Sequence, residues 1–159
     1  MTTLSFIKTF LLLAMFAGGP GHNLYAQGNQ YDHPSHSISV TNPETAKCFA
    51  EKYPAASDVR WYKKDHVFFK DNGKTVNAWF NKSGDFLYAV SYYDGEKLPA
   101  EILNIVYNDY YKFDIFGVTE VNVRDQTAYF VILENRTSFL KVKFIDGKVV
   151  AEDLMRKPA

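Results

Sequence analysis

The sequence lacks several features on which a functional assignment often depends. It contains one cysteine, Cys48, so it has neither an internal disulfide nor a zinc-binding cysteine spacing. Lys and Arg together number 18, as do Asp and Glu. This balance gives no overall field that would attract nucleic acid or an anionic membrane surface. We therefore expect neither a disulfide scaffold nor a nucleic-acid-binding protein.

Recognisable catalytic motifs are absent as well. The chain has no Gly-x-Ser-x-Gly, no His-Glu-x-x-His and no glycine loop that would bind phosphate. Cys48 has no histidine beside it in the sequence to activate a thiolate. The remaining candidates are two short elements that carry acidic residues, Asp65-His66 and Glu152-Asp153, and we expect Asp65 and His66 at a solvated hairpin tip. The sequence predicts no enzyme and no cofactor.

The first residues have the pattern of an export signal. Lys8 precedes an apolar run at residues 10–17 that is too short to cross a bilayer, and Ala26 is a small residue at a cleavage position. Residues 1–26 are therefore interpreted as a signal peptide and residues 27–41 as a polar, flexible leader. His33 and His36 in the leader have a metal-ligand spacing, but a flexible segment would not hold them, so we predict no metal site. The mature protein is expected in the periplasm or outside the cell, with no membrane insertion after cleavage.

Two helices are predicted, each with a proline at its start. Thr41 and Glu44 have capping-box spacing around Pro43, and Pro54 ends the first helix. Its apolar stripe comprises Ala46, Phe49, Ala50 and Tyr53. Leu98-Pro99 opens the second helix. Its stripe comprises Ile102, Ile105, Val106, Tyr110 and Phe113.

Two hairpins of alternating hydrophobicity follow the helices. In residues 75–90 the side chains of Val76, Ala78 and Phe80 lie on one face and those of Asn77, Trp79 and Asn81 on the other. A turn is expected at residues 71–74 before this hairpin, and another at residues 82–85 within it. In residues 138–152 the alternating set is Leu140, Val142 and Phe144, and Asp146-Gly147 is a two-residue turn signal. We expect all six side chains in one core, together with Phe49 and Ile105.

Shorter strands complete each half of the chain. Val59 and Trp61 share one parity and should point inward, and Val121 and Val123 repeat that pattern after a break at Gly117. Each half is then one helix followed by four antiparallel strands. We predict an α+β fold, with two tandem helix-plus-four-strand units at residues 42–97 and 98–156 forming one antiparallel sheet. Both helices are expected on one face of this single domain, residues 42–156.

This layout resembles the PepSY-like family, exported proteins of Gram-negative bacteria described as similar to β-lactamase-inhibitor protein. The residues that carry the resemblance are Phe49, Tyr53-Pro54, Val59-x-Trp61, Ala78-x-Phe80, Gly84, Leu98-Pro99, Ile102, Ile105 and Tyr110. The resemblance implies a continuous sheet covered by two helices, with no catalytic residues. Inhibitory relatives bind a protein on the concave sheet face, but they carry disulfides that this chain cannot form, so inhibition is not carried over.

The strand parity also predicts which side chains face away from the core. If Val76, Ala78 and Phe80 point inward, their neighbours in the same strand must point to the opposite face. The predicted face carries Tyr62, Asn77, Trp79, Phe139, Lys141 and Lys143. Aromatic residues beside polar ones resemble an interface core with a polar rim, although aromatic pairs across strands can also simply stiffen a sheet.

Two functional hypotheses follow. In the first, an exported, non-enzymatic module recognises a protein or peptide on this sheet face. In the second, a pocket between the helices and the sheet holds a small apolar or envelope-derived molecule, which would make the protein a carrier or an envelope sensor. A flat aromatic face with no cavity would favour the first hypothesis, and a cavity between the helices and the sheet would favour the second.

Overall fold

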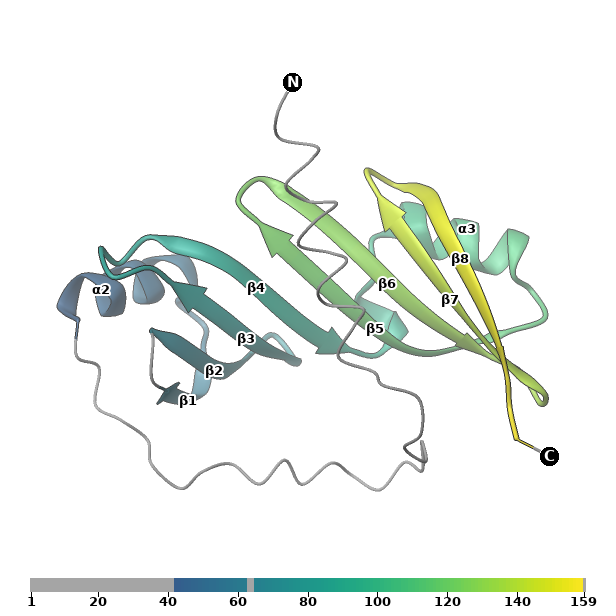
Figure 1. Ribbon diagram of the computed structural model, residues 1–159, viewed down its shortest axis with the longest axis horizontal. Helices are drawn as coiled ribbons and strands as arrows, with labels where there is room; N and C mark the ends of the chain where they lie inside the picture. The colour runs from purple at the N-terminus through teal and green to yellow at the C-terminus, as the bar shows by residue number, and fades with distance from the viewer. Residues whose placement is uncertain (1–41, 63–64, 159) are drawn as a thin grey trace. The chain divides into compact units, whose positions relative to one another are not determined.

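A computed structural model describes residues 42–62 and 65–158, and the predicted signal peptide, the leader and its histidine pair lie outside these residues. Two α-helices, one 3-10 helix and eight strands lie within the described residues (Figure 1). In chain order they are α2 (Pro43–Lys52), β1 (Ser57–Tyr62), β2 (His66–Asp71), β3 (Lys74–Phe80), β4 (Phe86–Tyr93), η1 (Gly95–Lys97), α3 (Ala100–Asp109), β5 (Asp114–Val123), β6 (Gln126–Glu134), β7 (Ser138–Ile145) and β8 (Lys148–Arg156).

The described strands form a single sheet of simple order. Each strand pairs antiparallel with the next in the chain, giving the order β1-β2-β3-β4-β5-β6-β7-β8 (Figure 1). This arrangement confirms the predicted α+β class with one antiparallel sheet. It also leaves β1 and β8 as the two edge strands.

The first helix begins one residue later than predicted, and its buried side is rotated. Asn42, rather than Thr41, is the N-cap, and its side-chain oxygen accepts a hydrogen bond from the Glu44 amide at 3.0 Å. The residues it buries are Thr45 and Phe49, whereas Ala50 is exposed. The predicted place of Ala50 on the apolar stripe is therefore wrong, because the helix turns the side that carries Thr45 and Phe49 toward the sheet.

The inward placement of Val59 is also wrong. Its side chain is 39% exposed, although Trp61 does pack against the core beside Phe49. The pairing of β1 with β2 is irregular between Ser57 and Arg60, and Asp58 has a positive φ of 52°. This bulge breaks the two-residue alternation that the prediction assumed.

In the second half of the chain, Gly117 was expected to separate the helical region from the next strand, and it does not. It lies inside β5, where the pairing with β6 is irregular between Ile115 and Gly117. The core-facing side chain of this strand is Val118, so Val121 and Val123 lie on the opposite face, contrary to the prediction. Val121 is nevertheless buried, at 6% exposure.

The predicted tight turns are present. Asn72 and Gly73 connect β2 to β3, and Asp146 and Gly147 connect β7 to β8, all four with positive φ. Such backbone angles are those of hairpin turns whose twist matches the twist of the strands. The turns therefore hold the register of both hairpins.

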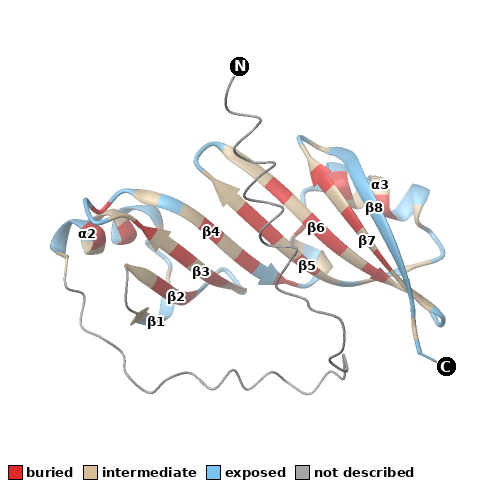
Figure 2. Ribbon diagram, viewed as in Figure 1, coloured by how far each residue is buried: buried red, intermediate tan, exposed pale blue. Residues whose placement is uncertain are grey.

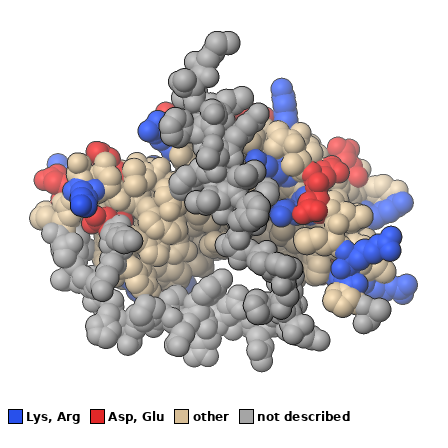
Figure 3. Space-filling view, in the orientation of Figure 1, with Lys and Arg blue, Asp and Glu red and all other residues tan. Residues whose placement is uncertain are grey.

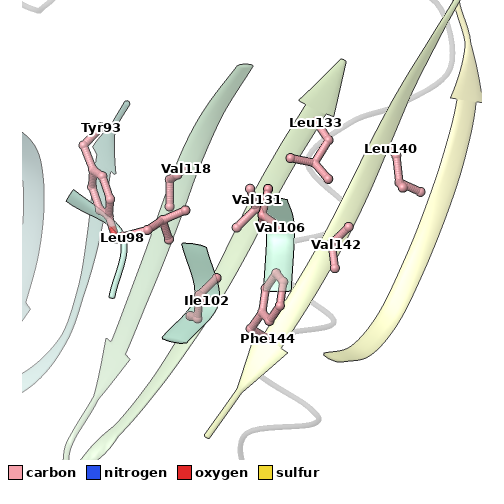
Figure 4. Close-up of a cluster of buried hydrophobic side chains, with 10 residues drawn as sticks. All are labelled: Tyr93, Leu98, Ile102, Val106, Val118, Val131, Leu133, Leu140, Val142 and Phe144. Atoms are coloured by element: carbon pink, nitrogen blue, oxygen red, sulfur yellow. The ribbon is translucent and has the colours of Figure 1, made fainter. Parts of the chain in front are cut away.

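The core consists of two clusters of buried side chains rather than one. Phe49, Val67, Phe69, Val76, Ala78, Phe80 and Ala89 form the cluster beneath α2. Tyr93, Leu98, Ile102, Val106, Val118, Val131, Leu133, Leu140, Val142 and Phe144 form the cluster beneath α3, which Figure 4 shows. Buried and half-buried residues alternate along β3 and β7 (Figure 2).

The cross-strand register explains why the expected single core is split. A row of paired residues runs Val76, Ser91, Glu120, Tyr129, Phe144 across five strands. Its two ends are apolar, but Ser91 and Glu120 are buried polar residues in the middle strands. Ile105 packs only against the second cluster, and Phe49 belongs only to the first.

Candidate functional site

Four aromatic side chains from four neighbouring strands form a continuous stack. The ring centroids of Tyr62 and His66 are 5.2 Å apart, and those of His66 and Trp79 are 4.4 Å apart with planes only 4° from parallel. Tyr88 continues the series at 4.4 Å from Trp79, with an angle of 16° between the ring planes. We refer to Tyr62, His66, Trp79 and Tyr88 as the ring stack.

The register of the hairpins creates this stack. Tyr62 pairs with His66, His66 with Trp79, and Trp79 with Tyr88, so each ring lies directly across from the next. Directly opposed side chains in antiparallel strands have Cβ atoms about 4.5–5.5 Å apart, a distance that suits offset stacking of rings. The stack is therefore fixed by strand pairing as well as by its own contacts.

His66 is held in the stack by a hydrogen bond as well as by its neighbours. Its Nε2 lies 2.9 Å from Oδ1 of Asn77, and the amide oxygen accepts the imidazole proton. Burial between the rings lowers the pKa of His66 below its ordinary value of 6.5, while the Asn77 bond opposes that shift. The imidazole is thus neutral at neutral pH, and its orientation is set by Asn77.

The ring stack lies on the face opposite to the core residues of the same strands. In β3, Trp79 alternates with Ala78 and Phe80, which are 0% and 3% exposed. In β2, His66 alternates with Val67, which is 0% exposed. All four rings are only partly buried. They retain surface that a partner could cover.

The other predicted site residues lie in β7 and make different contacts. The Lys141 ammonium is 3.7 Å from the Asp153 carboxylate. Lys143 lies over the Phe130 ring at 5.6 Å, and its partial burial lowers its pKa. Phe139 packs edge-on to Phe116 at 5.4 Å between centroids, and Phe116 is 55% exposed.

The six predicted residues therefore form two patches. Asn77 joins Tyr62 and Trp79 through His66, whereas Phe139, Lys141 and Lys143 are four strands further along the sheet. Adjacent strands are about 4.8 Å apart, so β3 and β7 are separated by about 19 Å. The row Thr75, Tyr92, Thr119, Phe130, Lys143 shows that both patches belong to the same face.

Sequence reasoning missed two members of the ring stack, His66 and Tyr88. His66 is not at a solvated hairpin tip, because Tyr62 and Trp79 cover both faces of its ring. The alternation in β2, with Val67 and Phe69 inward, places His66 on the outer face, and that signal was available in the sequence. Its position opposite Trp79 was not available, because it depends on the pairing register.

A buried polar cluster on the core side was also missed. Glu120 is 9% exposed and accepts hydrogen bonds from Lys74 Nζ at 2.8 Å, from the Tyr93 hydroxyl at 2.7 Å and from Asn122 Nδ2 at 2.7 Å. Burial raises the pKa of Glu120, but these three donors outweigh it and hold the pKa below its ordinary value. With every carboxylate oxygen bonded, the cluster is suited to holding strands together rather than to proton transfer.

Comparison with known proteins gives matches only at the level of structure. No family model matches the sequence, and no curated protein matches it. A BLIP-like protein from Bacteroides fragilis superposes with a TM-score of 0.57 and 16% identity, covering 74% of this chain and 89% of that one. The chain has a BLIP-like fold.

Two further solved structures from the same genus agree with this fold. A DUF2874 family protein from Bacteroides ovatus has a TM-score of 0.53 and 21% identity, covering 70% of this chain and 86% of that one. A Bacteroides eggerthii protein with a provisional periplasmic assignment has a TM-score of 0.52 and 18% identity, covering 71% of this chain and 88% of that one. At such identities the likeness concerns the fold.

The described residues offer neither a metal site nor a membrane-spanning helix. Within residues 42–62 and 65–158, no three His, Cys, Asp or Glu side chains are grouped so that they could hold a metal ion. No helix in this part of the chain has the length and apolar character needed to span a membrane. Among the described residues, the ring stack is the feature that most needs a functional account.

Proposed function

We propose that this protein is an exported, non-enzymatic binding module that recognises a protein or peptide on the ring-stack face of its sheet. The observation that carries the proposal is the ring stack itself, four partly exposed rings held in register across β1 to β4. The BLIP-like fold supports a binding role over an enzymatic one.

We infer that both helices cover the other face, in two tandem units of one helix and four strands. The Val76-to-Phe144 row supports this inference, because it links a residue of the α2 cluster to a residue of the α3 cluster through directly paired positions. The element order, α2 with β1 to β4 and then α3 with β5 to β8, supports the tandem arrangement expected of a PepSY-like domain. A partner would then meet the ring-stack face without displacing a helix.

The ring stack has the physical character of an interface core. Aromatic rings give large contact area, and because strand pairing already fixes these four, binding would cost little side-chain entropy. Trp79 is the central ring by position, with His66 on one side and Tyr88 on the other. Trp and Tyr are the residue types that most often dominate binding energy at protein interfaces.

The second patch gives the interface its charged component. Lys141 and Lys143 provide ammonium groups in the same strand as Phe139, which packs against Phe116. A partner that reaches both patches must span about 19 Å, which favours a protein or an extended peptide over a small molecule. Figure 3 shows an uncharged surface over β2 to β4 and charged side chains over the end that holds β7 and β8.

The carrier hypothesis has less support. Ile102 and Val106 on α3 are 1% and 2% exposed and pack directly against strand residues such as Val131 and Phe144 (Figure 4). Side chains therefore fill the space between α3 and the sheet where a ligand would have to lie.

Truncating the central ring tests the proposal. Trp79→Ala should weaken the binding of a partner captured from an envelope extract by about 2 kcal/mol or more, the size of an interface hot spot. Folding should survive, with a loss of about 1–2 kcal/mol from two missing ring contacts. Affinity is measured by calorimetry with the purified partner, and stability by urea unfolding.

Tyr107→Ala is the matched control, because Tyr107 is 66% exposed on α3 and lies away from the ring stack. It should change neither affinity nor stability. A partner that binds Trp79→Ala as tightly as the unchanged chain would refute the ring-stack site. Lys143→Ala should mainly slow association and reduce its dependence on salt.

We also propose export with cleavage after Ala26. The short apolar run at residues 10–17 and the small Ala26 support this proposal. The intact mass of the protein recovered from the cell envelope should correspond to a chain beginning at Gln27. A mass that includes residues 1–26 would contradict it.

A further inference from the structure

The two edges of the sheet differ in a way that bears on assembly. An edge strand leaves a row of backbone donors and acceptors unpaired, and proteins usually protect such an edge with a bulge, charges or proline. At β1 the pairing is irregular between Ser57 and Arg60, and Asp58 has a positive φ. That edge is therefore unsuited to accept another strand.

At β8 the edge is longer and more open. All nine residues from Lys148 to Arg156 are exposed, as the unbroken pale blue of β8 in Figure 2 shows. Its irregularity is confined to the first residues, where Lys143 and Phe144 pair with Ala151 and Val149. From Ala151 to Arg156 the strand is regular, and it carries the exposed apolar residues Leu154 at 61% and Met155 at 38%.

We propose that β8 is a dimerisation edge, pairing antiparallel with β8 of a second copy of this chain about a two-fold axis at Leu154. The proposal does not depend on the ring stack. In such a symmetric pair the residue on the axis faces its own copy, and residues equally far on either side face each other. The possible registers therefore differ only in which residue lies on the axis.

The charges of β8 select one register. An axis at Glu152 or Asp153 would place a carboxylate opposite its own copy, which is repulsive. An axis at Leu154 instead places Glu152 opposite Arg156 on both sides, so that two opposite-charge pairs flank a Leu–Leu contact. Figure 3 shows acidic and basic side chains interspersed at this end of the sheet.

Neighbouring axes are less suitable for reasons of structure. An axis at Ala151 would fall beside the irregular pairing near Val149. An axis at Met155 would pair Asp153 with Lys157, but Lys157 lies beyond the strand and already contacts Glu134 at 3.0 Å. Proline at position 158 has no N–H with which to extend the pairing.

Local contacts agree with a pairing at Leu154. Glu152 accepts a hydrogen bond from the Tyr110 hydroxyl through Oε1, which holds the side chain on its face and leaves Oε2 for an arginine. Leu154 pairs with the buried Leu140, yet it is itself 61% exposed. A second Leu154 would cover part of that exposed surface.

Charge exchange tests the register. In sedimentation equilibrium of the full-length exported protein, the unchanged chain should dimerise reversibly. Arg156→Glu and Glu152→Arg should each raise the dimer dissociation constant about tenfold or more, because each turns two attractive pairs into two repulsive ones. The double exchange Glu152→Arg/Arg156→Glu should restore dimerisation. Arg156→Glu leaves the Tyr110 contact intact, so its effect does not come from altered packing of α3.

A cross-linking experiment locates the axis. In a Cys48→Ser background, Leu154→Cys should form an intermolecular disulfide about tenfold faster than Met155→Cys, because only the axial pair brings two Cβ atoms within disulfide range. Circular dichroism checks that each variant is folded. A chain that stays monomeric at all concentrations overturns the proposal. The proposal is also overturned if the double-exchange variant is as monomeric as the two single variants. Equal rates of cross-linking at positions 154 and 155 overturn it as well.

Discussion

His66 is a titratable ring in a position where a charge is unfavourable. It is stacked between Tyr62 and Trp79, and its Nε2 hydrogen is directed to Asn77. Burial is the larger effect on its pKa, which is lowered. The folded protein therefore prefers the neutral imidazole, and the unfolded chain takes up a proton first as the pH falls.

This preference predicts a pH dependence of stability. The contribution of neutral His66 is fully present above about pH 6.5 and is lost as the pH falls through that value, levelling off below the folded pKa. His66→Phe keeps a ring in the stack but cannot titrate. The unfolding free energy of the unchanged chain should drop more between about pH 7.5 and 5.5 than that of the variant. Equal drops would show that His66 does not govern this window.

At the scale of elements, α2 is held against the turn between β3 and β4. Asn42 Nδ2 donates to the Lys82 carbonyl at 2.8 Å. Gly84, in the same turn, has a φ of 89°, and a Cβ there would lie 2.8 Å from the backbone of Glu44 and Thr45. The turn therefore needs glycine both for its backbone angle and for the close approach of the helix.

Gly84→Ala should lower the unfolding free energy by about 2–4 kcal/mol, because the left-handed angle and the contact with the α2 backbone both cost energy. Cys48, on α2 and partly buried, reports the displacement, since its thiol should react faster with a maleimide. Gly117→Ala is the control, with no atom within 4 Å of the added methyl group. It should be neutral or stabilising, and an equal loss in both variants would contradict the account.

At the scale of the whole molecule, the sheet joins two apolar clusters through a polar centre. Val76 belongs to the cluster beneath α2 and Val142 to the cluster beneath α3. Glu120, in a strand between them, accepts hydrogen bonds from Lys74 of β3 and from Tyr93 of β4. The two clusters therefore have separate packing contacts although they share one sheet.

Separate packing predicts additive mutations. Val76→Ala and Val142→Ala should each cost about 2 kcal/mol, for two methyl groups removed from a close-packed site. Destabilisations at residues without shared contact partners add to within about 0.5 kcal/mol. The unfolding free energy of the double variant, measured in urea, should therefore fall by about 4 kcal/mol. An interaction term above about 1 kcal/mol would mean that the clusters act as one core.

Much of the local structure was predictable from the sequence. Pro43 and Pro54 bound α2, Leu98-Pro99 precedes α3, and Asn72-Gly73 and Asp146-Gly147 form turns where expected. The alternation in β3 and β7 correctly assigned the buried side chains of both strands. These features depend on backbone angles and on short periodicity, which neighbouring residues determine among themselves.

The sequence was less informative wherever a bulge interrupted alternation. Val59 was predicted to point inward but is exposed, because β1 contains an irregular pairing, and Val121 was assigned to the inner face only by analogy with Val59. Nothing in the composition of these short segments marks the extra residue, because a bulge forms only against a partner strand. The predicted single core failed for a related reason, since Ser91 and Glu120 come between the clusters only once β4 and β5 are paired.

By itself, then, the sequence determined where the two helices and the tight turns lie and which side chains of β3 and β7 are buried. Only the tertiary structure decided that His66 and Tyr88 flank Trp79, and that Glu120 is bonded by residues from three strands. The physical reason is register. Which residue faces which across a sheet depends on contacts between segments far apart in the chain, and strand periodicity alone does not encode it.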